Sequence, residues 1–410
     1  MDITLAYGKA TLTVTVPDGV HVDTFGSRRS GGSLTRDVFL HRFRQSGADR
    51  VMRSSSPLII VNDGYRHTPT ALILTWLDSD FPGLLDRASY LVATGAHGAP
   101  TDDHFRSIFG KLYGRLLGRV TVHDCRDRNS MMPVGRDRFG CDVLLNRTVL
   151  EHDDVLVIGS VEPHYFAGFT GGRKSLFPGL CDLDTIERNH NLANSLEARP
   201  LRLSGNPVAE HFDELVSMLA DRTIYAVQVV ADADRVIHDV SCGEIRDAFA
   251  RAVAAARAVY ACEVGAPYDA VLCEMRPPLD SNLYQVQKGL ENCQAAVRSG
   301  GAAILASVCA EGVGSEHFFR QALTWDRIRN CPHDGVLRFG SHKLSRVIAM
   351  SQRIDIRLLS QLPQQDVRQV FYEPIDDLNT YLTERRASYD LDRLAVVYDA
   401  GHTVLTVKDN

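Results

Sequence analysis

The sequence predicts an α/β protein with two domains, each built on a mainly parallel sheet. Its 410 residues exceed what one core of ordinary size accommodates, which favours two domains. Short runs rich in Val, Ile and Leu alternate with helix-length segments. Because these runs are not interrupted by polar residues, we expect strands that are buried on both faces, as in parallel sheets covered by helices. We expect the active site in the cleft between the two domains.

The chain begins with a predicted β-hairpin, in which Ile3–Tyr7 and Thr11–Val16 flank Gly8-Lys9. Residues 24–56 are polar and rich in Arg and Ser, which indicates a loop with one short helix. Buried strands are then expected at Pro57–Val61, Tyr90–Ala93, Val120–His123, Val155–Ile158, Ala226–Val230, Ala270–Cys273, Ala302–Ala306 and Leu394–Val397. Helical patterns lie between several of them, for example Ile245–Tyr260 and Tyr284–Arg298.

A domain boundary is expected at Gly265-Ala266-Pro267, after a long Ala-rich helix and before a new strand. Residues 1–264 form the predicted N-terminal domain, which carries most of the motifs. Residues 265–410 form the predicted C-terminal domain, which closes over the substrate. The sequence leaves open whether the last strand, Leu394–Val397, returns to the first domain.

Composition indicates a globular protein that acts on a small molecule. Net charge is −6 and the 45 Lys and Arg residues are scattered. The chain therefore lacks the concentrated positive charge that would predict binding to nucleic acid. No segment has the order of a signal peptide, and no apolar run reaches the ~18 residues of a membrane span. The nine cysteines stand singly, without a CxxC pair. They are typical of reduced thiols in a cytoplasmic protein and do not predict a zinc site.

Three unusual loops follow predicted strands, where function collects in open α/β sheets. The first spans Val61–Pro69 and contains Asp63 and Arg66. A turn explains the Asp, Gly and Pro residues of this loop. It does not explain Arg66, whose guanidinium is suited to gripping a carboxylate or a phosphate.

The second loop runs from Ala93 to Asp103 and contains His97 among small residues. Thr101 is typical of a helix N-cap, which is a structural role. His97 precedes this cap, where a ligand can approach closely. Taken alone, it fits a solvated histidine as well as a catalytic one.

The third loop, Glu162–Gly179, contains His164 and the sequence Gly171-Gly172-Arg173-Lys174. Glycines and cations in one loop indicate backbone amides and positive charges gathered around an anion. A P-loop is the competing interpretation, but the pattern GxxxxGK[ST] begun at Gly168 requires glycine where Arg173 stands. The helical segment that follows carries His190, and histidine is a ligand for zinc, copper, nickel or iron.

Further along, Asp280 or Ser281 is expected to cap a helix that carries Tyr284, Gln285 and Lys288. Tyr284 and Lys288 are four residues apart and therefore share a face. This pair fits a tyrosine ring packed on a lysine stem as well as a binding surface.

Together these motifs resemble the nickel-dependent lactate racemase family over nearly the whole chain. The most specific part is the block from His164 through Gly171-Gly172-Arg173-Lys174 to Asn189-His190, which has the spacing of the family. The resemblance implies an isomerase that inverts the C2 centre of a 2-hydroxy acid. It also implies a nickel pincer nucleotide, a pyridinium mononucleotide with thioamide and thiocarboxylate arms, made by separate biosynthetic enzymes.

The resemblance further assigns roles to individual residues. Lys174 is the implied covalent attachment point and His190 the implied nickel ligand, while Asp63, Arg66, Gly171, Gly172 and Arg173 match positions near the cofactor. His97 and His164 match the two catalytic histidines. Arg66, Tyr284, Gln285 and Lys288 match positions that hold the substrate.

The implied reaction is reversible hydride transfer from the substrate to the cofactor through a planar 2-keto acid, with the two histidines serving opposite faces. Two positions depart from the family pattern: Gly98 replaces an arginine, and Phe339 stands where the lactate enzymes have tryptophan. These departures leave open a malate, aryl or longer 2-hydroxy acid, or a sugar acid epimerised at C2. A catalytically silent nucleotide- or nickel-binding homologue and a kinase or phosphohydrolase using the Lys174 loop are the remaining alternatives.

Overall fold

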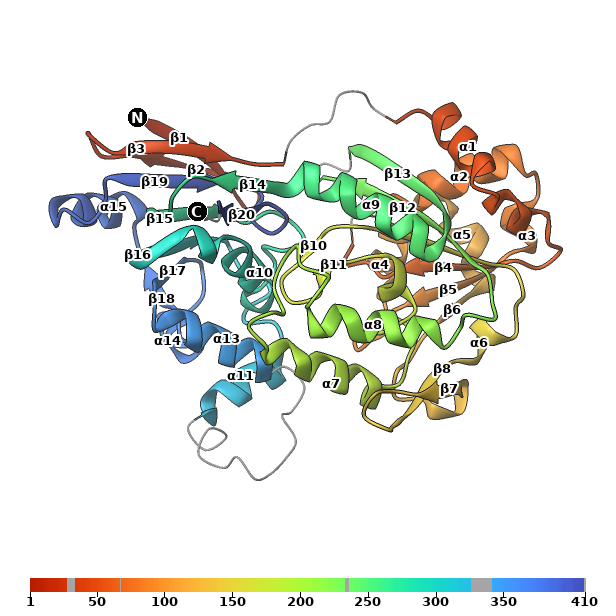
Figure 1. Cartoon of the computed structure of the whole chain (residues 1–410). Helices are drawn as coiled ribbons and strands as arrows, with labels where there is room; N and C mark the ends of the chain where they lie inside the picture. Colours follow the sequence, from red (N-terminus) through yellow and green to blue (C-terminus); the bar gives the residue numbers. More distant parts are fainter. Residues whose placement is uncertain (28–33, 67, 233–235, 326–340, 409–410) are drawn as a thin grey trace.

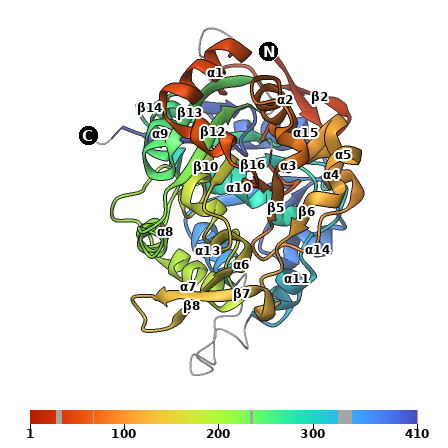
Figure 2. The same ribbon diagram turned by 90° about the vertical axis from the view of Figure 1, so that its right-hand side faces the viewer.

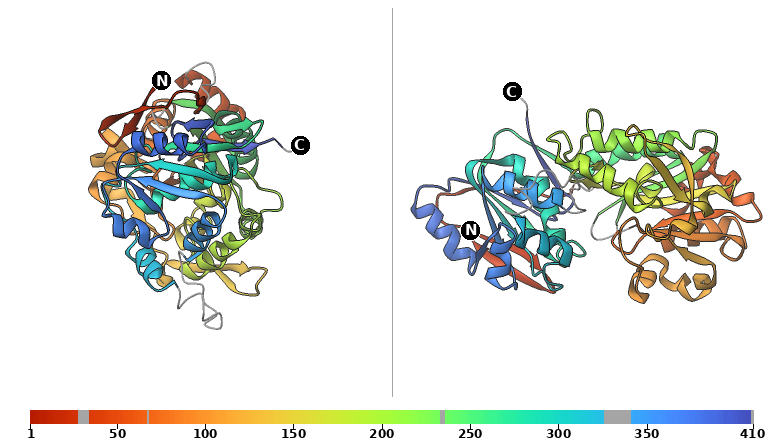
Figure 3. Two further views of the ribbon diagram at one scale, coloured as in Figure 1. Left: turned by 90° about the vertical axis from the view of Figure 1, so that its left-hand side faces the viewer. Right: turned by 90° about the horizontal axis from the view of Figure 1, so that it is seen from below.

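The computed structural model describes residues 1–27, 34–66, 68–232, 236–325 and 341–408. The molecule has two lobes, each built around one sheet (Figure 1, Figure 3). The first lobe comprises the described residues between 34 and 260, and the second lobe comprises residues 1–25 together with those between 261 and 408. The predicted α/β class with two mainly parallel sheets is confirmed.

The sheet of the first lobe is parallel except at one edge. Its strands are β4 (Leu58–Asn62), β5 (Ser89–Ala93), β6 (Val120–Val122), β9 (Val155–Ser160), β12 (Ile224–Ala231) and β13 (Ile237–Glu244). They lie in the order β13-β12-β9-β4-β5-β6, and only β13 runs antiparallel to its neighbour. The strands expected from unalternated apolar runs in this half are confirmed.

Both faces of this sheet are buried, as the apolar runs predict. Leu58 and Ile60 of β4 pack into one apolar cluster, whereas Ile59 and Val61 pack into another on the opposite face. Successive side chains of a strand point to opposite faces, so four apolar residues in a row require a cover on each side.

Helices provide these covers (Figure 2). Around the first sheet lie α1 (Arg36–Gln45), α2 (Thr70–Asp80), α3 (Leu84–Arg87), α4 (Asp102–Phe109), α5 (Tyr113–Leu116), α6 (Arg147–Leu150), α7 (Leu183–Asn191), α8 (Pro207–Ser217) and α9 (Ile245–Tyr260). The first lobe also has two small hairpins, β7 (Met131–Arg136) with β8 (Asp142–Asn146), and β10 (Pro163–His164) with β11 (Gly168–Phe169). Short 3-10 helices of the chain lie at Ala48–Arg53, Gly110–Leu112, Leu117–Arg119, Arg128–Ser130, Gly172–Ser175, Leu192–Asn194 and Gln294–Ala296.

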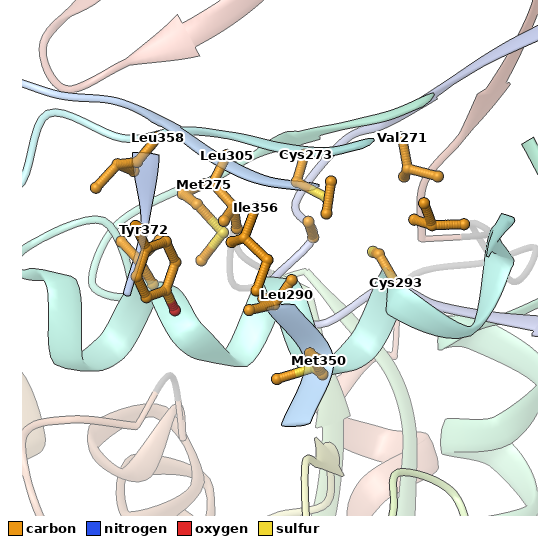
Figure 4. Close-up of a cluster of buried hydrophobic side chains, with 14 of the residues drawn as sticks. Val271, Cys273, Met275, Leu290, Cys293, Leu305, Met350, Ile356, Leu358 and Tyr372 are labelled. Carbon is orange, nitrogen blue, oxygen red and sulfur yellow. The ribbon is translucent and has the colours of Figure 1, made fainter. Parts of the chain in front are cut away.

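The sheet of the second lobe is parallel throughout. Its strands are β3 (His21–Phe25), β15 (Tyr268–Glu274), β16 (Val297–Ala306), β17 (Asp355–Leu359), β18 (Glu373–Ile375) and β19 (Arg393–Val397). They lie in the order β18-β17-β16-β15-β19-β3. The helices of this lobe are α10 (Leu283–Cys293), α11 (Glu316–Leu323), α13 (Ser341–Ser351), α14 (Gln364–Gln369) and α15 (Leu378–Ala387). Figure 4 shows Leu290 of α10 and Met350 of α13 packed below the sheet residues Val271, Cys273 and Ile356.

The two ends of the chain meet in the second lobe. The predicted hairpin is confirmed as β1 (Asp2–Tyr7) and β2 (Ala10–Thr15), and it packs against the second sheet. Strand β3 pairs with β19, so the N-terminal segment lies with the C-terminal half of the chain. The expected division into residues 1–264 and 265–410 remains a prediction. Leu394–Val397 lies inside the second sheet, and β14 (Ala261–Val264) pairs with β20 (Val404–Val407) beside it.

Two local expectations need correction. The helix expected to reach Arg298 ends at Cys293, because strand β16 already begins at Val297. Its N-cap is Asn282, whose side chain accepts a hydrogen bond from the Gln285 amide at 3.1 Å, and not Asp280 or Ser281. Among the described residues, no helix has the length and apolar character needed to cross a membrane.

Candidate active site

A cavity of about 290 Å³ lies where the two lobes meet. Its walls come from loops that follow the carboxyl ends of β4, β5 and β9, and from helices α7, α10 and α13. Parallel strands present their carboxyl ends at one edge of a sheet, which gathers the three predicted loops. Of the predicted site residues, the lining includes Asp63, Arg66, His97, His164, Gly171, Lys174, His190, Tyr284, Gln285 and Lys288.

His97 is oriented by a buried carboxylate. Its Nδ1 lies 2.6 Å from Oδ2 of Asp63. Burial raises the pKa of Asp63, but the hydrogen bond from His97 and the charges of His97 and Arg66 outweigh it and lower that pKa. The ionised carboxylate can only accept, so Nδ1 of His97 carries the hydrogen. In the neutral ring, Nε2 then keeps its lone pair and is suited to accept a proton.

His164 is held in the opposite sense by the β10–β11 hairpin. The Ala167 amide donates to Nδ1 of His164 at 3.2 Å. The hydrogen of the neutral ring therefore lies on Nε2, which is 3.3 Å from Nζ of Lys174. Burial, together with the positive charge of Arg66, holds the pKa of His164 well below its usual value, which keeps the ring neutral.

Lys174 completes this pair as an uncharged amine. Because Nε2 of His164 carries hydrogen, it donates to Nζ, and only a neutral amine has the lone pair to accept. Burial and the neighbouring charges of Arg66, Lys288 and Arg173 lower the pKa of Lys174 well below its usual value. Geometry and electrostatics therefore agree that Lys174 is neutral, which is the nucleophilic form of lysine.

The glycine-rich loop is shaped by close packing. Gly171 has φ +77°, and a Cβ at this position would lie 2.6 Å from Oε1 of Gln228 and 2.7 Å from the Ser160 carbonyl oxygen. Gly172 donates its amide hydrogen to Gln228 at 2.7 Å. Gly171 borders the cavity, and the tight packing fixes the backbone that carries Lys174.

Gly172 and Arg173, expected beside the nucleotide, do not line the cavity. Nε of Arg173 pairs with Oδ1 of Asp213 at 3.0 Å, and its guanidinium lies over the ring of Phe249. The cation is directed toward the helices that cover the sheet. Its described contacts are therefore structural.

His190 lies on α7, whose N-cap is Asp182. Its Nδ1 lies 2.9 Å from the carbonyl oxygen of Ile186 and donates to it, which leaves the lone pair of the neutral ring on Nε2. Burial is the main cause that lowers the pKa of His190 to about 3. This tautomer is the one that metal-binding histidines commonly adopt.

The opposite wall carries two cations on facing elements. Nη1 of Arg66 lies 3.6 Å from Oε2 of Glu162. Lys288 is buried on α10, and burial together with the charge of Arg66 lowers its pKa to about 7. Tyr284 lies one turn earlier, and Oε1 of Gln285 is buried without a hydrogen-bond partner among the described residues.

Comparison with known proteins shows what this arrangement is similar to. The family model for the N-terminal domain of lactate racemase matches residues 7–199, and that for the C-terminal domain matches residues 270–360. The chain belongs to the lactate racemase family. It is 28% identical to the lactate racemase of Thermoanaerobacterium thermosaccharolyticum over 81% of this chain and 79% of the relative. It is 25% identical to that of Lactiplantibacillus plantarum, over 88% and 91%.

The fold is also that of solved structures. The lactate racemase apoprotein of Thermoanaerobacterium thermosaccharolyticum superimposes with a TM-score of 0.86 at 23% identity, covering 99% of this chain and all of the other. A protein from Thermotoga maritima superimposes with a TM-score of 0.67 at 16% identity, covering 93% of this chain and all of the other. As a member of the lactate racemase family, the chain is an enzyme of the isomerase class.

The structure adds cavity residues that sequence reasoning missed. His342 and Lys343 lie at the start of α13 and line the cavity. Nζ of Lys343 donates to the Tyr284 carbonyl at 2.7 Å and lies over the ring of that tyrosine. The signal in the sequence is a histidine-lysine pair at a helix start, although it follows no predicted strand.

The two departures from the family pattern differ in what the structure says of them. A Cβ added at Gly98 would have no atom within 4 Å, because Gly98 is exposed and does not line the cavity. Phe339 lies outside the described residues.

Proposed function

We propose that this member of the lactate racemase family inverts the C2 centre of a 2-hydroxy acid, with a nickel pincer nucleotide held covalently by Lys174. The observation that carries the proposal is the neutral amine of Lys174, buried in a cavity with His97, His164 and His190. A cytoplasmic enzyme that receives its cofactor from separate biosynthetic enzymes is part of the same proposal.

The cavity fits a large polar cofactor. Besides Gln285 Oε1, the Ser175 hydroxyl on the cavity wall is buried without a hydrogen-bond partner among the described residues. Lys174 would attach the group and Nε2 of His190 would ligate nickel, which accepts imidazole nitrogen. When bound, the cofactor would supply an electron-poor pyridinium that takes the α-hydrogen of the substrate with its electron pair and returns it.

The histidines of the chain would move the hydroxyl proton. His97 presents a lone pair on Nε2 because Asp63 holds its Nδ1 hydrogen, so it is set as the base in this structure. His164 presents a hydrogen on Nε2 because Ala167 occupies its Nδ1. Inversion requires one group that accepts and one that donates, and the two rings are held in complementary states.

Arg66 and Lys288 would hold the substrate carboxylate. Both line the cavity near His164, and their charges together lower the pKa values of His164 and Lys174. A carboxylate placed between them would fix one end of a planar 2-keto acid, so that either face of the ketone can be presented.

A second candidate is a C2 epimerase of a sugar acid that uses the same cofactor. It is favoured by the departure from the family pattern at Gly98. Glycine at position 98 leaves out the arginine side chain of the family pattern, next to His97 on the cavity wall.

The test is a panel of optically pure 2-hydroxy acids, incubated with enzyme co-expressed with the cofactor-making enzymes. Lactate, malate, phenyllactate and gluconate are followed by chiral chromatography, with Lys174→Ala as the control. We expect the wild type to invert one of these acids and Lys174→Ala to invert none. No inversion of any acid by protein that carries nickel would favour a catalytically silent homologue.

A further inference from the structure

A continuous series of charged groups joins the two lobes next to Arg66, and three of its members have no role in the function proposed so far. It starts at Asp399 and His402 on the turn after β19 in the second lobe. It continues through Glu162 in the first lobe and ends at the Arg66 guanidinium in the cavity wall. Its carboxylates and imidazole are at most 5% exposed.

The spacing is that of alternating charges in contact. Nδ1 of His402 lies 3.0 Å from both carboxylate oxygens of Asp399. Nε2 of His402 lies 3.8 Å from Oε2 of Glu162, and the same oxygen lies 3.6 Å from Nη1 of Arg66. The other oxygen of Glu162 accepts a hydrogen bond from the Ser160 hydroxyl at 2.8 Å, which fixes the carboxylate plane.

The charge on His402 is stabilised by its surroundings. Burial lowers its pKa, but the carboxylates of Asp399 and Glu162 outweigh burial and raise it above the usual value. Other groups near this ring include Lys288, whose charge opposes protonation, and the ring of Tyr260. Removing the imidazolium from between two buried carboxylates would leave buried charges without a partner, so the three groups depend on one another.

The turn that carries His402 is rigid on its own lobe. Asn292 of α10 donates to the carbonyl oxygens of Ala400 and Gly401 at 3.0 and 2.9 Å. The Asp399 amide donates to Oε2 of Glu274, at the end of β15, at 3.1 Å. His402 is therefore positioned by the second lobe, while the carboxylate it faces belongs to the first.

We propose that Asp399, His402 and Glu162 form an interlobe relay that positions Arg66, so that the carboxylate-binding guanidinium is oriented only when the second lobe is seated. His402 is a positioning residue in this scheme, since it acts through Glu162 and does not line the cavity of about 290 Å³. The proposal rests on the proposed function for the role of Arg66.

The experiment measures binding of pyruvate, a planar 2-keto acid, by calorimetry to enzyme carrying its cofactor. His402→Gln and Glu162→Gln are each compared with the wild type. Each is expected to raise the Kd by about tenfold, the loss typical of one charge-assisted contact. His238→Gln removes another buried histidine-carboxylate pair, His238 with Asp232 at 3.0 Å. His238 does not border the cavity between the lobes, and we expect the Kd of this variant to stay within about twofold of the wild type.

A second comparison separates positioning from a general structural role. In an Arg66→Gln background, His402→Gln is expected to cause no further loss of pyruvate affinity, because its effect passes through Arg66. Losses that add in full, or a wild-type Kd in His402→Gln, would overturn the relay. Should His402→Gln fail to fold, Glu162→Gln carries the test from the other lobe.

The outcomes also separate the relay from the proposed function. Wild-type enzyme that binds pyruvate but inverts no 2-hydroxy acid contradicts the function, while the ratios of Kd between variants still decide the relay. Wild-type enzyme that does not bind pyruvate overturns the relay together with the role of Arg66.

Discussion

At the scale of single residues, the orientation of His97 by Asp63 leads to a graded prediction. Replacing His97 with Ala removes the base and is expected to lower kcat by ~10²–10⁴-fold. Asp63→Asn keeps a hydrogen-bond acceptor but loses the charge, so we expect a smaller loss of at least about tenfold. Turnover of the substrate found in the panel measures both, with the exposed His21→Ala as the control. Full activity in His97→Ala would contradict the two-histidine scheme.

The neutral state of Lys174 predicts a pH dependence that cofactor-free protein reveals. The lowered pKa of Lys174 and that of Lys288, about 7, mean that each amine loses its proton at a lower pH than an exposed lysine does. A small acylating reagent at pH 7 should label them more than the exposed Lys111, and labelling should fall as the pH is lowered and the amines become protonated. Peptide mass spectrometry gives the extent of labelling at each lysine. Labelling of Lys111 alone at every pH would contradict this expectation.

The sequence predicted the position of most cavity residues but not of the groups behind them. His97, His164, Lys174 and His190 come from loops and a helix whose order after predicted strands is visible in the sequence. Glu162 stands in the third loop, but its charged partners Arg66 and His402 come from other parts of the chain. His402 follows the predicted strand Leu394–Val397 by a few residues, so the same rule could have marked it. Its contact with Glu162 depends on how the lobes meet, which no local pattern encodes.

At the scale of elements, the glycine-rich loop predicts that Gly171 and Gly98 respond differently to the same change. Gly171→Ala places a Cβ against Gln228 and the Ser160 carbonyl at a positive φ, which should destabilise the fold by ~1–3 kcal/mol. Gly98→Ala meets no atom within 4 Å and should stay within ~0.5 kcal/mol of the wild type. Denaturant unfolding measures both. Equal stability of the two variants would contradict the packing described for the loop.

Strand and helix boundaries show where local patterns lose their force. Ile245–Tyr260 has the predicted bounds because its apolar period and its flanks agree. Helix α10 ends before the predicted position because Val297 begins strand β16, which pairs with β15 and β17. Strands β3, β13 and β18 lie at sheet edges and were missed, as was the interior strand β17, whose apolar residues are interrupted by Arg357. Edge strands bury less apolar surface, so they lack the Val, Ile and Leu runs that marked the central strands.

At the scale of the whole molecule, the N-terminal hairpin should stabilise the second lobe and not the first. Leu5 is fully buried against Ala270, Leu272 and Leu394, so Leu5→Ala should cost ~2–5 kcal/mol. Hydrogen exchange is expected to accelerate in β15 and β19 while β4 and β5 keep their protection. The exposed Thr13→Ala on the same hairpin is the control. Faster exchange confined to the first lobe would show that the hairpin belongs there.

The association of both chain ends in one lobe could not be predicted from sequence. Strand β19 follows the local pattern and β3 does not, and the pairing of the two joins segments from opposite ends of the chain. The α/β class of each lobe follows from local patterns that repeat along the chain. Which lobe a strand joins depends on contacts between segments far apart in the sequence.

The most direct test of the central claim is the intact mass of the protein after co-expression with the cofactor-making enzymes, measured together with nickel content. We predict an adduct with the mass of a thiolated pyridinium nucleotide, located on Lys174 by peptide analysis, and about one nickel per chain. The adduct should be absent in Lys174→Ala and present in Lys288→Ala. Protein without adduct and nickel under these conditions, or an adduct on another lysine, would contradict the account.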